Sequence, residues 1–241
     1  MNTTVSAGRG DRPLISLVVP CTASDVLFIP YMLRSVNYQT YLPAEVIIAV
    51  SGIEPKPARQ LELQWRAEID QRVALTLLDS REPAFAGPNR QRGGECSRSE
   101  IISFFDADDV QAPCRLEKIA DAFTASHVKA VFHRFTMHRV PGYPEIDEAA
   151  WYNGALKMYH RGWISVRRRV IQYIRWGDEP RSQDFHYLKR YLDTFGKRDI
   201  AFLPEFLGHY VSTGYEQQNA QAQPKIAALQ KKLADYSQAA D

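Results

Sequence analysis

The segment Ile101-Ile102-Ser103-Phe104-Phe105-Asp106-Ala107-Asp108-Asp109 joins an apolar run to a cluster of carboxylates. The run at 100–105 is nearly continuous in apolar residues, which is typical of a strand buried on both faces of a parallel sheet. Three earlier runs, at 14–19, 45–50 and 73–78, have the same character, and segments with helical patterns lie between them. Alternating strands and helices predict βαβ units. We therefore expect an α/β fold with a mostly parallel sheet flanked by helices.

The second half of the chain is less regular, and its expected elements are fewer. Residues 86–97 are expected to form a loop and then a helix, despite Gly93 and Gly94. The other expected elements are helices at 113–125, with Pro113 at the first helical position, and at 182–195, closed by Gly196, and strands at 128–135 and 201–204. Residues 136–153 are rich in aromatics, Pro and Gly and are expected to form loops.

The composition excludes several classes of protein. Apolar residues make up 45% of the 241 residues and charged residues 24%, which argues against disorder. The net charge of +2 is too small to indicate nucleic acid as a partner, and it would not repel an anionic substrate. Three cysteines without a Cys-x-x-Cys pair favour a reducing cytoplasm. No signal peptide or spanning segment is expected, and peripheral contact with a membrane stays open.

The acidic run follows a predicted strand, and ligands of open α/β sheets bind beyond the carboxyl ends of strands. If the chain stays extended there, Asp106 and Asp108 point the same way. Two such carboxylates repel unless a cation neutralises them, and their oxygens suit Mg²⁺ or Mn²⁺ shared with substrate phosphates. An acidic turn without a ligand is the alternative, because Asp favours turns and helix caps. A calcium loop is excluded, since Val110 and Gln111 occupy positions that need an oxygen ligand and a glycine.

Other short segments precede and follow the acidic run, and their order along the chain is informative. Pro113 and Arg115-Leu116-Glu117 follow it, and Ser35-Val36-Asn37-Tyr38-Gln39-Thr40-Tyr41 and Arg90-Gln91 with Gly93 precede it. This order resembles the signature of the family 2 glycosyltransferases, which are inverting enzymes with the GT-A fold that use nucleotide sugars. The resemblance implies a single Rossmann-like GT-A domain at 13–215, with a donor half at about 13–112 and an irregular acceptor half at about 113–215. A helix or tail is expected at 216–241.

The resemblance also implies roles for residues of the acidic run. Asp106 would hold the ribose or base side of the donor, while Asp108, together with Asp109, would reach the metal ion on the diphosphate. Arg90 would contribute to donor binding. His209 lies near the family's closing Tyr-Arg-x-His region and would touch the metal or the diphosphate, with a structural role as the alternative. Mn²⁺ or Mg²⁺ is the implied cofactor, and a UDP-sugar is the expected donor.

Two loops of the predicted donor half depart from the family pattern. The family often has Asp after the second strand to hold the nucleotide base, but this chain has Ser51 there. The loop after the first strand often reads Pro-Thr-Tyr-Asn in the family, whereas here it runs from Pro20 to Asp25. We therefore expect Pro20 and Ser51 at the nucleotide. Asp25 either substitutes as a nucleotide contact or caps the following helix.

An inverting transfer needs a base that takes the proton from the acceptor hydroxyl. The family usually supplies it from a Glu-Asp pair at the start of a helix, and Arg181-Ser182-Gln183-Asp184-Phe185 resembles that segment with Gln183 in place of Glu. Asp184 is then the candidate base. Alternatively, Asp184 only complements the helix dipole, with Ser182 as the N-cap. Asp178 and Glu179 are rival carboxylates.

The sequence thus predicts a metal-assisted glycosyltransferase that moves a sugar from a nucleotide sugar to a glycan or lipid-linked acceptor. A sugar nucleotidyltransferase is a weaker alternative, because it would carry a Gly-rich basic loop after the first strand, and 20–25 contains no Gly, Lys or Arg. A catalytically inactive module that binds carbohydrate or nucleotide is the other alternative, and the missing Asp at position 51 supports it.

Overall fold

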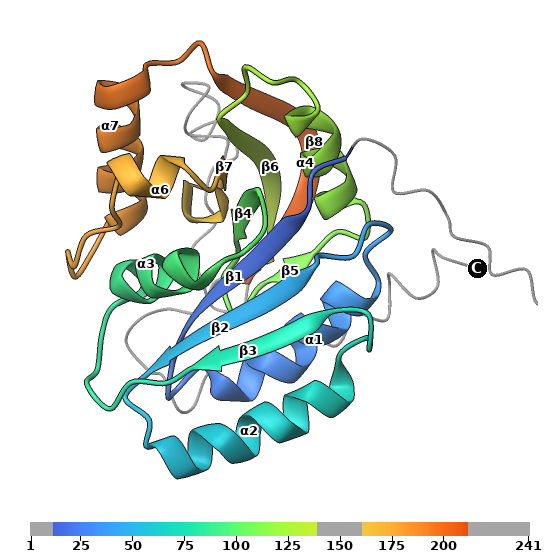
Figure 1. Cartoon of the computed structure of the whole chain (residues 1–241), viewed down its shortest axis with the longest axis vertical. Helices are drawn as coiled ribbons and strands as arrows, with labels where there is room; N and C mark the ends of the chain where they lie inside the picture. The colour runs from blue at the N-terminus through green and yellow to red at the C-terminus, as the bar shows by residue number, and fades with distance from the viewer. Residues whose placement is uncertain (1–11, 139–160, 212–241) are drawn as a thin grey trace, which may run out of the picture.

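The computed structural model describes residues 12–138 and 161–211, which form an eight-stranded sheet covered by helices (Figure 1). The strand order across the sheet is β3-β2-β1-β4-β7-β6-β8-β5. The strands are β1 Ile15–Thr22, β2 Glu45–Ser51, β3 Ala74–Leu78, β4 Ile101–Phe104, β5 Val110–Gln111, β6 Ala130–His138, β7 Ser165–Arg167 and β8 Ile200–Val211. The α-helices are α1 Ile29–Asn37, α2 Pro55–Glu68, α3 Ala86–Cys96, α4 Arg115–Phe123, α6 Val170–Tyr173 and α7 Gln183–Phe195, and 3-10 helices lie at Val26–Phe28 and Arg161–Trp163.

β1 is the centre of a parallel half-sheet. It pairs with β2 on one side and with β4 on the other, and β2 pairs with β3. Val18 of β1 lies opposite Ile47 and Phe104. The β1 side chains from Ile15 to Cys21 are all buried, which explains why their apolar run lacks the alternation of a half-exposed strand. Because the four strands run in the same direction, the chain leaves β1, β2 and β4 at one common edge.

The other half of the sheet mixes strand directions. β7 is antiparallel to both β4 and β6, while β6 and β8 are parallel. The short strand β5 pairs antiparallel with β8, with Val110 opposite His209. The acidic run therefore connects β4 in the middle of the sheet with β5 at its edge.

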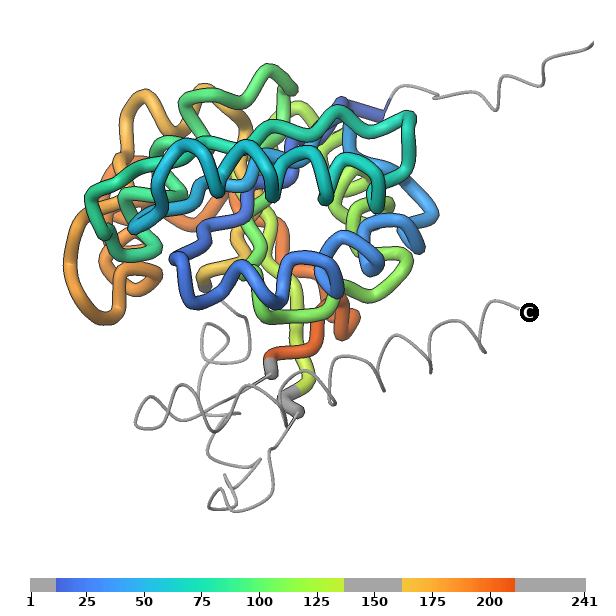
Figure 2. Tube along the Cα trace, turned by 90° about the horizontal axis from the view of Figure 1, so that it is seen from below, coloured from blue at the N-terminus to red at the C-terminus, as the bar shows by residue number. Residues whose placement is uncertain are grey.

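Helices cover both faces of the sheet (Figure 1). α1 and α2 cover one face, where Met32 and Trp65 join the buried cluster of Leu17 and Val19. Figure 2 shows the same two helices from below, running across the molecule, with the α6–α7 segment at one side. Burial of these side chains supplies the main stabilisation of the fold, because removing apolar area from water is favourable.

The opposite face carries α3, α6 and α7. The buried side chains of Ile171 and Tyr187 join the cluster around Val18 there. α4 packs elsewhere, where Leu116 and Ile119 contact Ile15 near the start of β1. The face used by each β1 residue alternates along the strand, as the two-residue period of a strand requires.

The predicted α/β architecture is confirmed, and each of the four apolar runs is a strand, although β3 lies at the edge of the sheet and is only partly buried. Three expectations need correction. Residues 86–96 are helical throughout, without a preceding loop at 86. α4 begins at Arg115, so Pro113 precedes the helix instead of opening it. β6 begins later and ends later than the expected 128–135, and β8 extends beyond the expected 201–204.

The loops expected at 136–153 begin later than predicted, because β6 continues to His138. The remainder of those loops and the expected helix or tail at 216–241 lie outside the described residues. Within residues 12–138 and 161–211, no helix combines the length and the apolar character needed to cross a bilayer.

Gly93 explains how α3 can be helical despite two glycines. A Cβ at Gly93 would overlap Cγ1 of Val18, so the glycine permits the close approach of α3 to β1.

We expect Gly93→Ala to lower the free energy of unfolding by about 1–3 kcal/mol, the usual effect of overpacking. Gly94→Ala is the matched control, since its Cβ would lie 3.4 Å from Ile171 Cδ1. It should be neutral or stabilising by up to about 1 kcal/mol, because Ala favours helix over Gly. Urea denaturation measures both, and equal losses would contradict this account.

Candidate functional site

The acidic run forms a turn directly beyond β4. The backbone N–H of Asp109 donates to the carbonyl of Asp106 at 3.4 Å, which closes the turn over Ala107 and Asp108. Asp106 and Asp108 are partly exposed, whereas Asp109 is only 1% exposed. The chain is therefore not extended here, although the expectation that Asp106 and Asp108 point the same way assumed an extended chain. The turn itself leaves two of the three carboxylates accessible at the common edge of the parallel strands.

Asp106 is held by an arginine from α3. Arg90 donates to the Asp106 carboxylate in a short ion pair, and its guanidinium lies over the ring of Trp176 at 4.8 Å. The Arg90 side chain is 6% exposed and that of Asp106 is 21% exposed. A charge-assisted hydrogen bond of this kind orients the carboxylate. Arg90 is thus placed at the acidic turn, where its expected contribution to donor binding would act through Asp106.

Ser51 and Asn89 join the ends of β1 and β2. The Asn89 amide donates to the carbonyl of Cys21 and to the hydroxyl of Ser51, both at 3.0 Å. The Ser51 hydroxyl in turn donates to the carbonyl of Ala84 at 3.0 Å, and Ser51 is 1% exposed. Asn89 was not identified from the sequence. The signal available was its position directly before Arg90-Gln91, the segment that resembles the family. Ser51 lies at the expected edge with its hydroxyl engaged inside the protein.

The loop after β1 is organised by Asp25. Its carboxylate accepts hydrogen bonds from the backbone N–H and the hydroxyl of Thr22, at 3.1 Å and 2.7 Å. Asp25 occupies the N-cap position of the 3-10 helix that begins at Val26, but its side chain makes no capping bond. Asp25 is therefore the N-cap residue by position, as the capping alternative expects, but its carboxylate does not cap the helix. Pro20 is buried within β1, two residues beyond the last pairing of β1 with β4 at Val18.

His209 lies beside the acidic turn. It is the β8 partner of Val110, which directly follows Asp109, and its Nδ1 is hydrogen-bonded with the hydroxyl of Thr136 on β6. Among residues 12–138 and 161–211, no three His, Cys, Asp or Glu side chains form a group suited to a metal ion. Mg²⁺ commonly takes only one or two carboxylates and completes its coordination with substrate phosphates. The accessible, hard oxygens of Asp106 and Asp108 fit an ion of that type.

The start of α7 packs against the start of α3. A Cβ at Gly87 would overlap the carbonyl of Gly177 and would lie 3.1 Å from Oε1 of Gln183, the first residue of α7. Asp184, the candidate base, is the second residue of α7 and is partly exposed. Ser182 has a left-handed backbone, with φ of 55°, and its side chain makes no capping bond. Ser182 is therefore the N-cap residue of α7 by position, as expected, but its hydroxyl does not cap the helix.

The rival carboxylates differ in their surroundings. Glu179 accepts a hydrogen bond from Arg190 at 2.9 Å, and this guanidinium lowers the pKa of the Glu179 carboxyl. Asp178 is exposed. A carboxylate with a lowered pKa is a weaker proton acceptor, so the surroundings of Glu179 do not favour it as a base.

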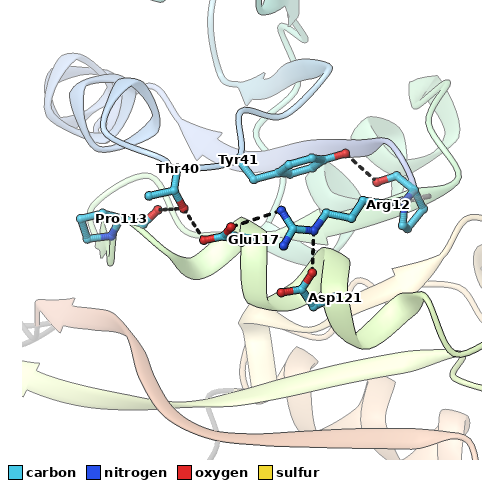
Figure 3. Close-up of polar contacts among 7 residues, drawn as sticks. Arg12, Thr40, Tyr41, Pro113, Glu117 and Asp121 are labelled. Carbon is cyan, nitrogen blue, oxygen red and sulfur yellow. Dashed lines mark hydrogen bonds and ion pairs between the residues drawn. The ribbon is translucent and has the colours of Figure 1, made fainter. Parts of the chain in front are cut away.

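The segment at 35–41 is hydrogen-bonded to the start of α4, just beyond the acidic turn. The Gln39 amide donates to the carbonyl of Ala112 at 2.8 Å and accepts from the backbone N–H of Leu116 at 3.0 Å. Figure 3 shows Thr40 and Arg12 converging on Glu117, with Arg12 also reaching Asp121. These contacts fix the start of α4, and hence the chain that follows the acidic turn.

The comparisons with known proteins agree with this arrangement. Residues 16–177 match the model of "Glycosyl transferase family 2". This chain belongs to glycosyltransferase family 2. An uncharacterized glycosyltransferase of Methanocaldococcus jannaschii is 25% identical over 111 residues, which are 46% of this chain and 37% of the relative. The predicted family is confirmed.

Solved structures show the fold of this family 2 member. TarS of S. aureus in complex with UDP-GlcNAc superposes with a TM-score of 0.63 at 16% identity, covering 86% of this chain and 61% of that one. The mannosyltransferase PcManGT of Pyrobaculum calidifontis, in complex with GDP-Man and Mn²⁺, gives 0.62 at 18% identity over 92% and 69%. The single-domain GT-A architecture is thereby confirmed. The chain spans 39% of the longer TarS structure and 37% of the archaeal relative.

The Gln39 bridge of this family 2 member can be tested by substitution. Gln39→Met removes the amide's bonds to Ser35, Ala112 and Leu116. The Ala112 carbonyl keeps its bond from the Arg115 N–H, but the buried Leu116 N–H loses its partner, at about 1–3 kcal/mol of unfolding free energy. Asn37→Leu is the control, because the Asn37 amide also bridges two backbone groups, of Glu68 and Asp70, but is exposed. Water replaces its lost bonds, so we expect about 1 kcal/mol or less. Chemical denaturation decides, and a larger loss in Asn37→Leu would refute the role of Gln39.

Proposed function

We propose that this protein is an inverting, metal-assisted glycosyltransferase that moves a sugar from a nucleoside diphosphate sugar to an acceptor hydroxyl. The observation that carries the proposal is the turn of Asp106, Asp108 and Asp109 at the common edge of β1, β2 and β4, in a chain that belongs to family 2. That edge is where ligands of open α/β sheets bind. TarS bound to UDP-GlcNAc and PcManGT bound to GDP-Man support a nucleotide sugar as the donor, with a UDP-sugar as our first choice.

Donor binding is assigned to the edge of the parallel strands. Asp106, oriented by Arg90, holds the ribose or base side. Pro20, Asp25 and Ser51 lie at or near the ends of β1 and β2 and line the nucleotide. The Ser51 hydroxyl already bonds to Asn89 and Ala84, so it offers the base less hydrogen-bonding capacity than a free carboxylate would.

Asp108, Asp109 and His209 are the proposed metal contacts, together with oxygens of the diphosphate. The Mn²⁺ bound to PcManGT supports a divalent ion at such a site. A bound divalent cation would stabilise the negative charge that grows on the departing nucleoside diphosphate. The accessible carboxylate of Asp108 is the best placed of the acidic turn to contact it directly, because Asp109 is buried.

Asp184 is the proposed general base. It takes the proton from the acceptor hydroxyl while the acceptor oxygen forms a bond to the anomeric carbon, and the bond from that carbon to the diphosphate breaks. Its position at the start of α7, next to the start of α3, supports this role. Glu179 is ion-paired with Arg190 and fits the role less well. The acceptor is a glycan or a lipid-linked sugar, and the reaction takes place in the cytoplasm, with peripheral membrane contact in the lipid-linked case.

A catalytically inactive binding module is the second candidate. The engaged hydroxyl of Ser51 favours it, because that position supplies no carboxylate to the nucleotide base. The two candidates differ in one product, since only an enzyme releases nucleoside diphosphate from a nucleotide sugar. Incubation with a panel of UDP- and GDP-sugars, with and without glycan acceptors, separates them.

The metal role predicts a cation dependence of nucleotide binding. UDP should bind more tightly with Mn²⁺ than with a chelator, and Asp108→Ala should remove this difference while the protein stays folded. The physical reason is that carboxylate and diphosphate share the ion. Asp193→Ala is the control, because Asp193 is an exposed carboxylate of α7 paired only with Lys189 in the described contacts. Calorimetry measures the affinities, and equal UDP affinity with Mn²⁺ and with chelator in the wild type would exclude the metal role.

If Asp184 is the general base, its substitution should reduce the rate of sugar transfer without weakening the binding of UDP. Asp184→Asn should reduce transfer by about 10²–10⁴-fold, the usual contribution of a general base, and leave the affinity for UDP nearly unchanged. Glu179→Gln is the matched variant on the rival carboxylate and should retain most of the transfer activity. If Asp184 only complements the helix dipole, Asp184→Asn should keep transfer and lose less than about 1 kcal/mol of stability. Steady-state transfer assays and denaturation of both variants distinguish these outcomes.

A further inference from the structure

A completely buried guanidinium lies beneath the acidic turn. Arg115 is 0% exposed, although it is the first residue of α4. Its Nη2 donates to the carbonyls of Phe104 at 3.1 Å and Trp163 at 3.4 Å, and its Nη1 donates to Oε1 of Gln111 at 2.9 Å. Its Nε donates to Nε2 of His133 at 2.8 Å. Five donors in one rigid plane allow a single arginine to reach four elements in this way.

The acceptors of Arg115 flank the acidic turn on both sides. Phe104 precedes Asp106 by two residues, and Gln111 follows Asp109 by two residues. The guanidinium therefore fastens the end of β4 and the strand β5 to the same point. The ring of Phe105, between Phe104 and Asp106, lies 4.7 Å below the guanidinium. A change in the length or shape of the Arg115 side chain must alter the separation of the two ends of the turn.

The bond to His133 shows that this contact is specific. Because Nε2 of His133 accepts from Arg115, its proton is on Nδ1, which donates to the carbonyl of Arg134 at 2.9 Å. His133 is thus neutral, and it is 1% exposed. The four acceptors of Arg115 described above are neutral groups. They solvate the buried cation without cancelling its charge.

The uncancelled charge of Arg115 acts on the carboxylates of the turn. Burial lowers the pKa of Arg115 to about 9, and the negative charge of Asp106 opposes this fall. The group is still charged at neutral pH. Three carboxylates within four residues repel one another, and a nearby buried cation offsets part of that repulsion. Arg90 and Arg115 thus bring two positive charges to the turn of Asp106, Asp108 and Asp109.

We propose that Arg115 is a positioning residue that sets both the shape and the charge of the acidic turn, and thereby its affinity for a divalent cation with a nucleoside diphosphate. This inference rests on the proposed function, since it assumes that the turn binds these ligands. Arg115 itself touches neither ligand. Its role differs from that of Arg90, which pairs directly with Asp106.

Arg167 provides a matched control within the same sheet. It also satisfies backbone carbonyls with a largely buried guanidinium, donating to Val128 at 2.7 Å, Phe123 at 2.9 Å and Ala125 at 3.2 Å. It lies on β7 opposite Ile101, at the far end of β4 from the acidic turn. Loss of Arg167 removes equivalent interior contacts without affecting the turn.

The experiment compares Arg115→Lys with Arg167→Lys. Lysine keeps the charge but loses the planar fork, so it cannot hold both flanks of the turn. We expect Arg115→Lys to raise the Mn²⁺ concentration needed for half-maximal UDP binding by about 10–100-fold, as for other residues that orient metal ligands. Arg167→Lys should lower the unfolding midpoint and leave the Mn²⁺ dependence at the wild-type value. Calorimetry with UDP across a Mn²⁺ series gives the first quantity, and denaturation gives the second.

Gln111→Met is a second variant that tests the proposal if Arg115→Lys does not fold. It removes one acceptor of Arg115 from the buried side of β5 with little change in volume, and we expect a smaller shift of the Mn²⁺ dependence in the same direction. Wild-type Mn²⁺ dependence in folded Arg115→Lys, or in Gln111→Met when Arg115→Lys does not fold, would overturn the proposal.

A failure of the proposed function gives a different result, seen in the wild type alone. If wild-type UDP binding is independent of Mn²⁺, the metal role of the turn is wrong, and the role of Arg115 is judged from UDP affinity without metal. Arg115→Lys, or Gln111→Met if that variant does not fold, should then still bind UDP more weakly than Arg167→Lys. Equal affinities would reject the positioning role as well.

Discussion

The parallel pairing of β1 with β2 and β4 is the constraint on which the candidate site depends. β1 is buried on both faces, so its register with Ile47 and Phe104 cannot slip without exposing apolar side chains. This register brings three chain segments to one edge of the sheet. Asn89 then ties the ends of β1 and β2 together, and Arg90 ties α3 to the acidic turn. Adjacent residues of one helix thus connect all three segments.

The parallel half of the fold is predictable from the sequence because its signal is local. Continuous apolar runs such as 45–50 report burial on both faces, and the acidic run marks the end of its own strand. α3 is less predictable, since Gly93 disfavours a helix by propensity. The glycine is there because of Val18, which lies far away in sequence and makes room only for a residue without a Cβ. Tertiary packing overrides local propensity at that point.

The candidate site is also predictable only where the signal is local in the sequence. The sequence identified the carboxylates, but it could not show that Asp106 pairs with Arg90, or that the Ser51 hydroxyl is engaged by Asn89. It left the Asp25 carboxylate between a nucleotide contact and a helix cap, and it could not show the hydrogen bond from Thr22 to that carboxylate. Each of these partners is chosen by packing between elements, which periodicity and spacing do not encode.

The signature of the family therefore contains two kinds of residue. Asp106 and Asp108 remain accessible at the edge of the sheet, where a charged ligand can reach them. Gln39 and Arg115 belong to the same recognisable sequence pattern, yet both are buried and hydrogen-bond to groups on either side of the turn. Carboxylates that repel one another do not hold a fixed geometry by themselves. A short acidic run becomes a defined site only when the interior fixes the chain on both sides of it, so a pattern that includes the supporting residues identifies the site better than the carboxylates alone.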